Sequence, residues 1–147
     1  MFMYINSIRY NNSVVDGPGI RTVLFMQGCD IHCKGCQNKS IWDINKGMEV
    51  DIDDLVNELN KKIFNKKITI SGGEPLLQKE ALIELVTKLN DLGFDIALYT
   101  GHQKEDVPSI LIDKIKYLKT GNYIQGLKTT IKPFVGSENQ VFEEVKK

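Results

Sequence analysis

The chain has 147 residues, 41% of them hydrophobic and 26% charged, which fits one globular domain spanning residues 1–147. Nineteen Lys and Arg offset nineteen Asp and Glu, so no net field attracts polyanions, and we expect no nucleic-acid partner. No apolar run approaches the roughly 20 residues of a membrane span, and the first residues lack the pattern of a signal peptide. We therefore expect a cytoplasmic protein with no membrane partner.

Strands and helices are expected to alternate along the chain, because short β-branched or apolar runs alternate with segments of helical apolar spacing. Glycine follows several of these segments, as is typical of helix ends and of turns after strands. In chain order we expect a strand at 23–26, a helix at 51–65, a strand at 67–71, a helix at 79–92, a strand at 95–99, a short helix from about residue 108 and a strand at 115–119.

This alternation predicts the α/β class, because strand–helix–strand units form right-handed crossovers in a parallel sheet. A full (β/α)₈ barrel takes about 250 residues, so the chain is too short for one. We expect an open partial barrel with a mostly parallel, curved sheet. Ligands bind at the carboxyl ends of the strands in such sheets. The loops that begin near residues 29, 71, 99 and 119 fall at those ends, which predicts one shared site.

The three cysteines of the chain lie within eight residues, at Cys29, Cys33 and Cys36. Such crowding is poor for disulfides and good for a metal site. Thiolates select zinc, copper(I) or iron–sulfur clusters, and iron–sulfur clusters are commonly held by four cysteines. Because the chain has no fourth cysteine, a cubane cluster on these three ligands would keep one iron open for an exogenous ligand. We therefore expect a cluster with an open iron.

Two other interpretations of the cysteine loop stay open. A zinc site with three cysteines and one histidine could use His102, or less easily His32, which is adjacent to Cys33. A cluster that only transfers electrons is also compatible with the spacing, although the open iron argues against it. Zinc without sulfide or visible absorption would identify a non-catalytic zinc-binding module.

The cysteine spacing resembles the signature of the radical S-adenosylmethionine superfamily. The resemblance implies that the amino and carboxylate groups of S-adenosylmethionine chelate the open iron. It also implies that one electron from the reduced [4Fe–4S] cluster releases methionine and a 5′-deoxyadenosyl radical. Members usually carry an aromatic residue before the third cysteine, where this chain has Gly35. This departure is typical of one subgroup and loosens the adenine contact.

Further segments resemble glycyl-radical activating enzymes. Residues 15–21, Val-Asp-Gly-Pro-Gly-Ile-Arg, look like their N-terminal signature, although the same residues also suit an ordinary turn. The flanks of the cysteine loop, 27–29 and 36–42, match the same group. The tail at 120–123 and 136–140 resembles anaerobic ribonucleoside-triphosphate reductase activating proteins, the smallest members of the superfamily.

The segment Ser71-Gly72-Gly73-Glu74-Pro75 resembles the family motif for the methionine moiety. Two glycines let a backbone approach a ligand closely, and carbonyls with a carboxylate suit an ammonium group. Lys119 stands at a strand end facing the same site, where it could meet the ligand carboxylate or point to water. The cofactor-binding residues that the resemblance implies are Gly35, Cys36, Gln37, Gly72, Gly73, Glu74 and Lys119, with Cys29, Cys33 and Cys36 as metal ligands.

The resemblance implies an oxidoreductase whose substrate is a protein, the large subunit of an anaerobic ribonucleoside-triphosphate reductase, on which a glycyl radical is generated. A flavodoxin-like protein would supply the electron, and the oligomeric state, including a dimer, is left open. The reaction needs no general base, so His32 and His102 receive no catalytic role. The alternatives are a pyruvate formate-lyase activating enzyme-like protein or a 7-carboxy-7-deazaguanine synthase-like enzyme with a small substrate.

Overall fold

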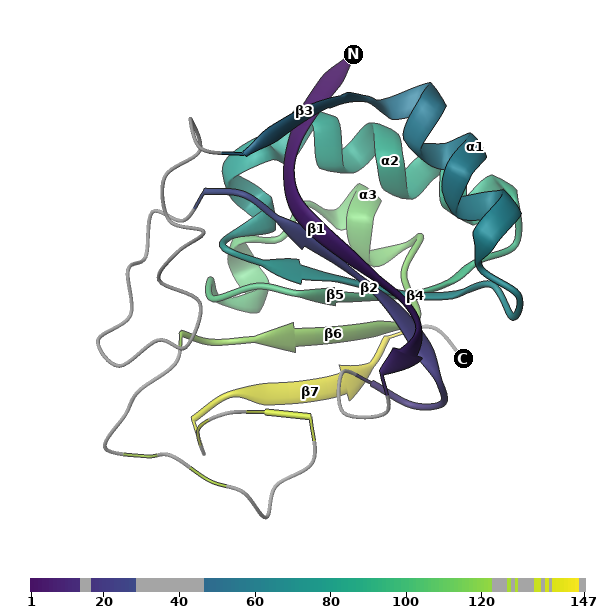
Figure 1. Cartoon of the computed structure of the whole chain (residues 1–147). Helices are drawn as coiled ribbons and strands as arrows, with labels where there is room; N and C mark the ends of the chain where they lie inside the picture. The colour runs from purple at the N-terminus through teal and green to yellow at the C-terminus, as the bar shows by residue number, and fades with distance from the viewer. Residues whose placement is uncertain are drawn as a thin grey trace.

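The computed structural model describes residues 1–13, 17–28, 47–122, 127, 129, 134–135, 137 and 139–145. In this part of the chain, seven strands form one sheet in the order β3-β1-β2-β4-β5-β6-β7 (Figure 1). The strands are β1 (Phe2–Ser13), β2 (Arg21–Met26), β3 (Met48–Asp51), β4 (Lys67–Gly72), β5 (Asp95–Tyr99), β6 (Tyr117–Thr120) and β7 (Val141–Glu144). The helices are α1 (Ile52–Lys62), α2 (Lys79–Asp91) and α3 (Ser109–Ile112), with 3-10 segments η3 (Pro75–Gln78) and η4 (Lys104–Asp106).

The four central strands, β2, β4, β5 and β6, are parallel, as the alternation predicts. The outer strands β1, β3 and β7 pair antiparallel with their neighbours, which the sequence did not predict. The two ends of the sheet, β3 and β7, do not pair with each other. The expected α/β class and the open sheet are therefore confirmed, and the expected parallel pairing is confirmed for the centre of the sheet.

Helix α1 begins and ends where its charges favour it. The side chain of Asp51 caps the helix by accepting a hydrogen bond from the backbone N–H of Asp54. Acidic residues occupy the first turn, and Lys61 and Lys62 occupy the last, which suits the helix dipole. The apolar stripe of the helix is buried and consists of Ile52, Leu55, Val56 and Leu59.

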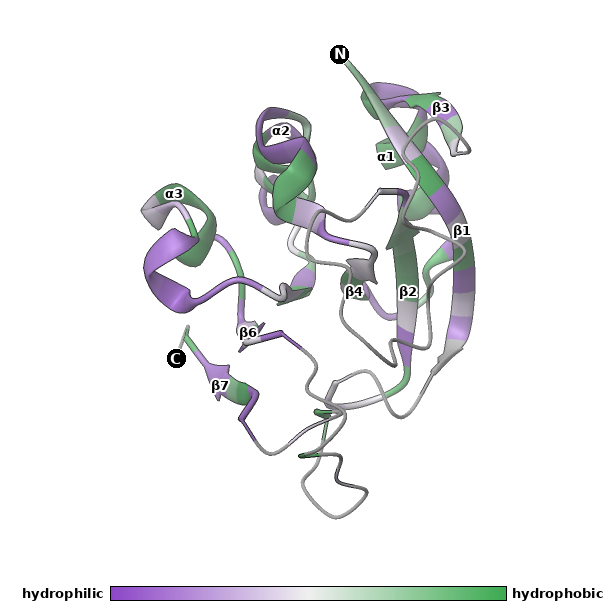
Figure 2. Cartoon of the chain, turned by 90° about the vertical axis from the view of Figure 1, so that its left-hand side faces the viewer, coloured by the Kyte–Doolittle hydropathy of each residue, from purple (hydrophilic) through white to green (hydrophobic). Residues whose placement is uncertain are grey.

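One hydrophobic core lies between the helices and a single face of the sheet. Figure 2 shows α1, α2 and α3 along the same side of the strands. Because side chains alternate across a strand, every second strand residue reaches this core. The buried strand residues of the core include Met3, Ile5, Leu24, Met26, Ile68, Ile70, Ile96, Leu98 and Leu118. None of the helices in the described part of the chain is long and apolar enough to cross a lipid bilayer.

The opposite face of the sheet is more polar and aromatic. The strand register aligns Val23 with Thr69, Thr69 with Ala97, and Ala97 with Tyr117. The alternate residues of the same strands that share this face are Arg21, Phe25, Ser71, Tyr99 and Lys119. This face therefore offers the donors, acceptors and aromatic rings that the core face lacks.

Arg21 joins three strands at the amino end of the parallel sheet. Its side chain is fully buried, and it donates to Thr69 Oγ1 at 2.9 Å, to the carbonyl of Ile68 at 2.9 Å and to the carbonyl of Pro18 at 3.0 Å. It also donates to the carbonyl of Asp95 at 2.8 Å and to its Oδ1 at 2.9 Å. A buried guanidinium requires such partners, because an unpaired buried charge is very costly.

The segment Gly17-Pro18-Gly19 is shaped around this arginine. Gly17 has a φ of +124°, and a Cβ there would lie 3.0 Å from Cδ of Arg21. Glycine therefore allows both the backbone conformation and the close approach. The motif that resembles an activating-enzyme signature thus has a structural role at the end of the sheet away from the predicted site.

Replacing Arg21 by Met should lower the free energy of unfolding by about 3–5 kcal/mol, because it leaves Asp95 and two strand carbonyls without their donor. Urea unfolding of the apo-protein measures this change. Lys62→Met is the matched control, since it removes an exposed ion pair with Glu58 and a cation–π contact with Tyr10 at 5.3 Å, which together should cost about 1 kcal/mol. Equal losses in the two variants would contradict the role of Arg21.

Candidate functional site

The carboxyl ends of β2 and β4 are joined by their backbones. The N–H of Gly73 donates to the carbonyl of Met26 at 3.1 Å, and the N–H of Glu74 donates to the carbonyl of Gly28 at 2.7 Å. Gly28 is the residue before Cys29. The turn after β4 is therefore hydrogen-bonded to the segment that leads directly into the cysteine loop, as expected for loops that share one edge of the sheet.

Gly72 makes this contact possible. It has a φ of +109°, and a Cβ there would lie 2.5 Å from the carbonyl oxygen of Met26 and 2.9 Å from the carbonyl carbon of Phe25. No side chain can occupy that position without moving β2. The sequence suggested that the two glycines let a ligand approach. The structure gives a second reason for glycine at position 72, which the sequence did not reveal: the absence of a side chain lets β2 pack against it.

The carboxyl group of Glu74 is fully buried beneath this turn. Oε2 accepts hydrogen bonds from the N–H of Leu76 and the hydroxyl of Thr100, each at 2.8 Å. Oε1 accepts one from the N–H of Gly101 at 2.7 Å. The side chain thus caps η3 and ties the end of β4 to the end of β5.

Burial raises the pKa of Glu74 above its ordinary value, while the hydrogen bonds from Gly101, Leu76 and Thr100 oppose that rise. The sequence suggested that this carboxylate suits an ammonium group. In the structure both of its oxygens accept hydrogen bonds from the chain, so the contribution of Glu74 to ligand binding stays a prediction.

Lys119 lies near the same end of the sheet, on the face away from the helices. Its Nζ stands 4.2 Å from the centre of the Tyr99 ring, a cation–π contact. Phe142 of β7 meets the Tyr99 ring edge-on at 6.2 Å and stacks with Tyr117 at 5.5 Å. Sequence analysis missed this aromatic group, although Tyr99 and Tyr117 stand in strands that it predicted.

The predicted ligands Cys29, Cys33 and Cys36 lie outside the described residues, as do Gly35 and Gln37. Within the described part of the chain, no group of three or more His, Cys, Asp or Glu side chains could hold a metal ion. The donor set itself fits an iron–sulfur cluster, because three soft thiolates follow the anchored Gly28 within eight residues. His102, the candidate zinc ligand, has Nδ1 4.0 Å from the carboxylate of Asp106.

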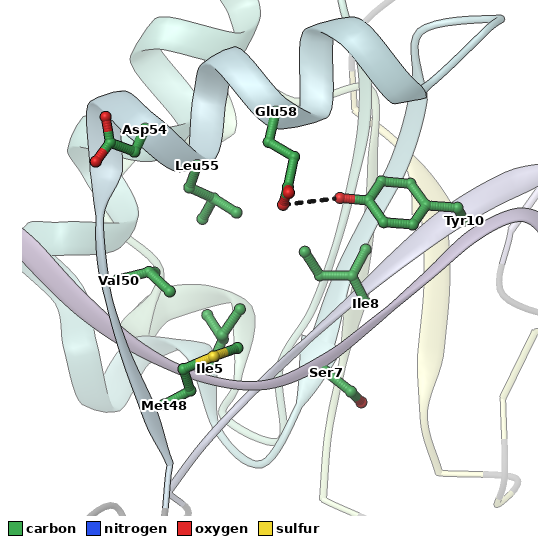
Figure 3. A pocket seen from close by; sticks show the side chains of 9 residues that line it. All are labelled: Ile5, Ser7, Ile8, Tyr10, Met48, Val50, Asp54, Leu55 and Glu58. Carbon is green, nitrogen blue, oxygen red and sulfur yellow. Dashed lines mark hydrogen bonds between the residues drawn. The ribbon is translucent and has the colours of Figure 1, made fainter.

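A hollow of about 400 Å³ lies between α1 and the strands β1 and β3 (Figure 3). The hydroxyl of Tyr10 donates to the Glu58 carboxylate across this hollow at 3.1 Å. Burial of Tyr10, together with the negative charge of Glu58, raises the pKa of Tyr10 to about 12. The lining holds no cysteine or histidine and consists of Ile5, Ser7, Ile8, Tyr10, Met48, Val50, Asp54, Leu55 and Glu58. This hollow is separate from the loops at the carboxyl ends of the parallel strands.

Comparison with known proteins identifies the class. The family described as a 4Fe-4S single cluster domain matches residues 15–143, a span that includes the cysteine loop and the Gly72–Glu74 turn. The chain is therefore a single-cluster iron–sulfur protein.

Known relatives define the family more narrowly. The anaerobic ribonucleoside-triphosphate reductase-activating protein of Escherichia coli (strain K12) is 33% identical over 148 residues, which cover 93% of this chain and 96% of the relative. The protein of the same name from Salmonella typhimurium is 33% identical with the same coverage. The pyruvate formate-lyase-activating enzyme of Clostridium pasteurianum is 40% identical over 92 residues, which are 59% of this chain and 39% of that enzyme.

The chain belongs to the family of anaerobic ribonucleoside-triphosphate reductase-activating proteins, which are radical S-adenosylmethionine activases. It is an enzyme, and its cofactors are a [4Fe–4S] cluster and S-adenosylmethionine.

Replacing Gly72 by Ala should lower the free energy of unfolding by about 3 kcal/mol or more, because a clash with β2 adds to the cost of a positive φ. Gly93→Ala is the matched control. Gly93 has a φ of +84° but nothing within 4 Å of its Cβ position, so only the backbone cost of about 1–2 kcal/mol applies. Urea unfolding of both apo-proteins measures the difference. Equal losses of unfolding free energy in the two variants would contradict the predicted clash between residue 72 and β2.

Proposed function

We propose that the chain activates an anaerobic ribonucleotide reductase by generating a glycyl radical on it. When bound, the reduced cluster supplies the electron that cleaves S-adenosylmethionine to methionine and a 5′-deoxyadenosyl radical, which removes a hydrogen atom from a glycine of the partner. One observation carries the proposal: the Gly-Gly-Glu turn is hydrogen-bonded to the backbone that leads into the three cysteines. The turn is thereby bonded to Gly28, the residue before the first of the three cysteines.

Each residue proposed for the site either binds the cluster or S-adenosylmethionine, or positions a residue that does. Cys29, Cys33 and Cys36 hold the cluster through their thiolates and, being only three, leave one iron open to the cofactor. The backbone carbonyls of Gly72 and Gly73 would accept from the ammonium group of S-adenosylmethionine. Gly73 would leave that approach free of a side chain, whereas the missing side chain of Gly72 admits β2.

Glu74 is a positioning residue in this scheme. Its buried carboxyl group fixes the turn through Leu76, Thr100 and Gly101, and its backbone lines the cofactor site. Gly35 and Gln37, which flank Cys36 in the sequence, are proposed to line the cofactor site as well. Lys119 lies near the site with its ammonium on the Tyr99 ring and is the candidate for the ligand carboxylate.

The open sheet bears on how the radical is protected. The strands of the described residues do not close into a barrel, which supports the proposal of an open partial barrel of the radical S-adenosylmethionine type, in one domain over residues 1–147. A radical must be kept from water and bystander groups. We therefore place the glycine loop of the partner at the carboxyl ends of the parallel strands, where it would complete the cavity.

The electron donor and the compartment follow from the same chemistry. A cluster that receives one electron at a time suits a flavodoxin-like donor. Three thiolates kept available for iron require a reducing compartment such as the cytoplasm. The chain works in a complex with its partner, and both a free dimer and a complex with a dimeric partner are compatible with this scheme.

Pyruvate formate-lyase is the second candidate partner, because its activating enzyme from Clostridium pasteurianum is 40% identical over 92 residues. That match spans only 39% of the larger enzyme, whereas the reductase-activating proteins match at 96% of their length. This agreement in length favours the anaerobic reductase over pyruvate formate-lyase as the partner.

Mixing the reduced, reconstituted chain and S-adenosylmethionine with the anaerobic reductase should produce a glycyl-radical signal in electron paramagnetic resonance. Cys33→Ala should abolish both the signal and the release of 5′-deoxyadenosine, because it removes a cluster ligand. Parallel mixtures with pyruvate formate-lyase test the second partner. A signal only with that enzyme would refute the assigned partner, and zinc without sulfide in the purified chain would refute the radical reaction.

A further inference from the structure

The side chain of Gln78 bonds to strand β1 as another peptide group would. Gln78 is the last residue of η3, which begins directly after Glu74. Its Oε1 accepts a hydrogen bond from the N–H of Tyr4 at 2.8 Å, and its Nε2 donates to the carbonyl of Tyr4 at 2.8 Å. One amide thus satisfies both backbone groups of a single strand residue, 74 positions away in the sequence.

The same amide also reaches the end of β2. Nε2 of Gln78 donates to the carbonyl of Gln27 at 3.1 Å, and the N–H of Gln27 donates to the carbonyl of Tyr4 at 3.2 Å. The side chain of Gln27 is buried and accepts a hydrogen bond from Asn6 at 3.1 Å. Gln27 is therefore held through its N–H, its carbonyl and its side chain.

These bonds lie where the strand ladder is irregular. The register between β1 and β2 shifts between the pairs Ile5–Met26 and Ser7–Phe25, so Asn6 is an extra residue in β1. Such a bulge weakens regular pairing at that place. The amide of Gln78 supplies hydrogen bonds to Tyr4 and Gln27, one residue beyond the Ile5–Met26 pair that ends the ladder at this bulge.

The backbone from Met26 to Gly28 is thus hydrogen-bonded on two sides to one short segment, residues 73–78. On the β4 side, the N–H groups of Gly73 and Glu74 bond to the carbonyls of Met26 and Gly28. On the β1 side, Gln78 bonds to Gln27. The 3-10 segment η3 connects these two sets of hydrogen bonds, and Glu74 caps it.

We propose that Gln78 is a positioning residue for the cluster: it fixes the backbone of Gln27 relative to the Gly-Gly-Glu turn. Gly28, the residue before the first predicted cluster ligand, and the turn for S-adenosylmethionine are then held together. The inference rests on the proposed cofactor site but not on the identity of the partner protein. Outer residues that orient metal ligands in this way commonly change metal affinity by about 10–100-fold when replaced.

Gln78→Leu tests the proposal, because it removes the amide at similar volume. Thr22→Val is the matched control. Thr22 Oγ1 also accepts a hydrogen bond from a β1 backbone N–H, that of Asn11 at 3.0 Å, but at the far end of the β1–β2 pair. Gln78→Glu is the second variant if Gln78→Leu does not fold, since it keeps an acceptor for Tyr4 and loses both donated bonds.

Three measurements are made without a partner protein. Anaerobic iron release to a chelator should be about 10-fold faster in Gln78→Leu than in the wild type, and close to wild type in Thr22→Val. Amide hydrogen exchange in the apo-protein should increase at Tyr4 and Gln27 in Gln78→Leu alone. The electron paramagnetic resonance spectrum of the reduced cluster should shift when Gln78 is replaced and should not shift when Thr22 is replaced.

Unchanged iron release and an unchanged spectrum in Gln78→Leu would overturn the proposal. Equal acceleration of iron release in Gln78→Leu and Thr22→Val would also overturn it, because the effect would then be general destabilisation. Failure of the proposed function would appear differently, as a missing glycyl radical in a protein whose cluster responds to Gln78 as expected.

Discussion

The contact between the ends of β2 and β4 is the constraint on which the site depends. Gly73 and Glu74 donate their N–H groups to the carbonyls of Met26 and Gly28, and Gly72 has no side chain to keep the strands apart. The turn and the start of the cysteine loop therefore cannot move independently. The buried carboxyl group of Glu74 extends the same connection to β5 through Thr100 and Gly101.

Two buried ionisable side chains hold opposite ends of the parallel sheet. Arg21 joins β2, β4 and β5 at their amino ends through carbonyls and Asp95. Glu74 joins β4 and β5 at their carboxyl ends. Each is fully buried and each is surrounded by hydrogen-bonding partners, which burial of a polar group demands. The central strands of the parallel sheet are therefore tied to one another at both ends.

The sequence predicted the elements whose pattern is local. The helices near 52–62 and 79–91 and the four parallel strands follow from apolar periodicity and glycine turns. Strand β1 was missed because the extra residue Asn6 breaks its alternation, and β7 because four residues at a sheet edge carry little signal. The roles of Arg21 and Gln78 depend on partners 47 to 74 positions away, which only the register of the sheet brings together.

An anaerobic crystal structure of the reconstituted chain with S-adenosylmethionine tests the central claim most directly. We expect the amino group of the ligand at the carbonyls of the Gly72–Gly73 turn, beside a cluster on the three cysteines. We also expect Glu74 to keep its bonds to Leu76, Thr100 and Gly101. Ligand bound in the hollow between α1 and β1, or a Glu74 carboxylate turned out of its pocket to meet the ligand, would contradict it.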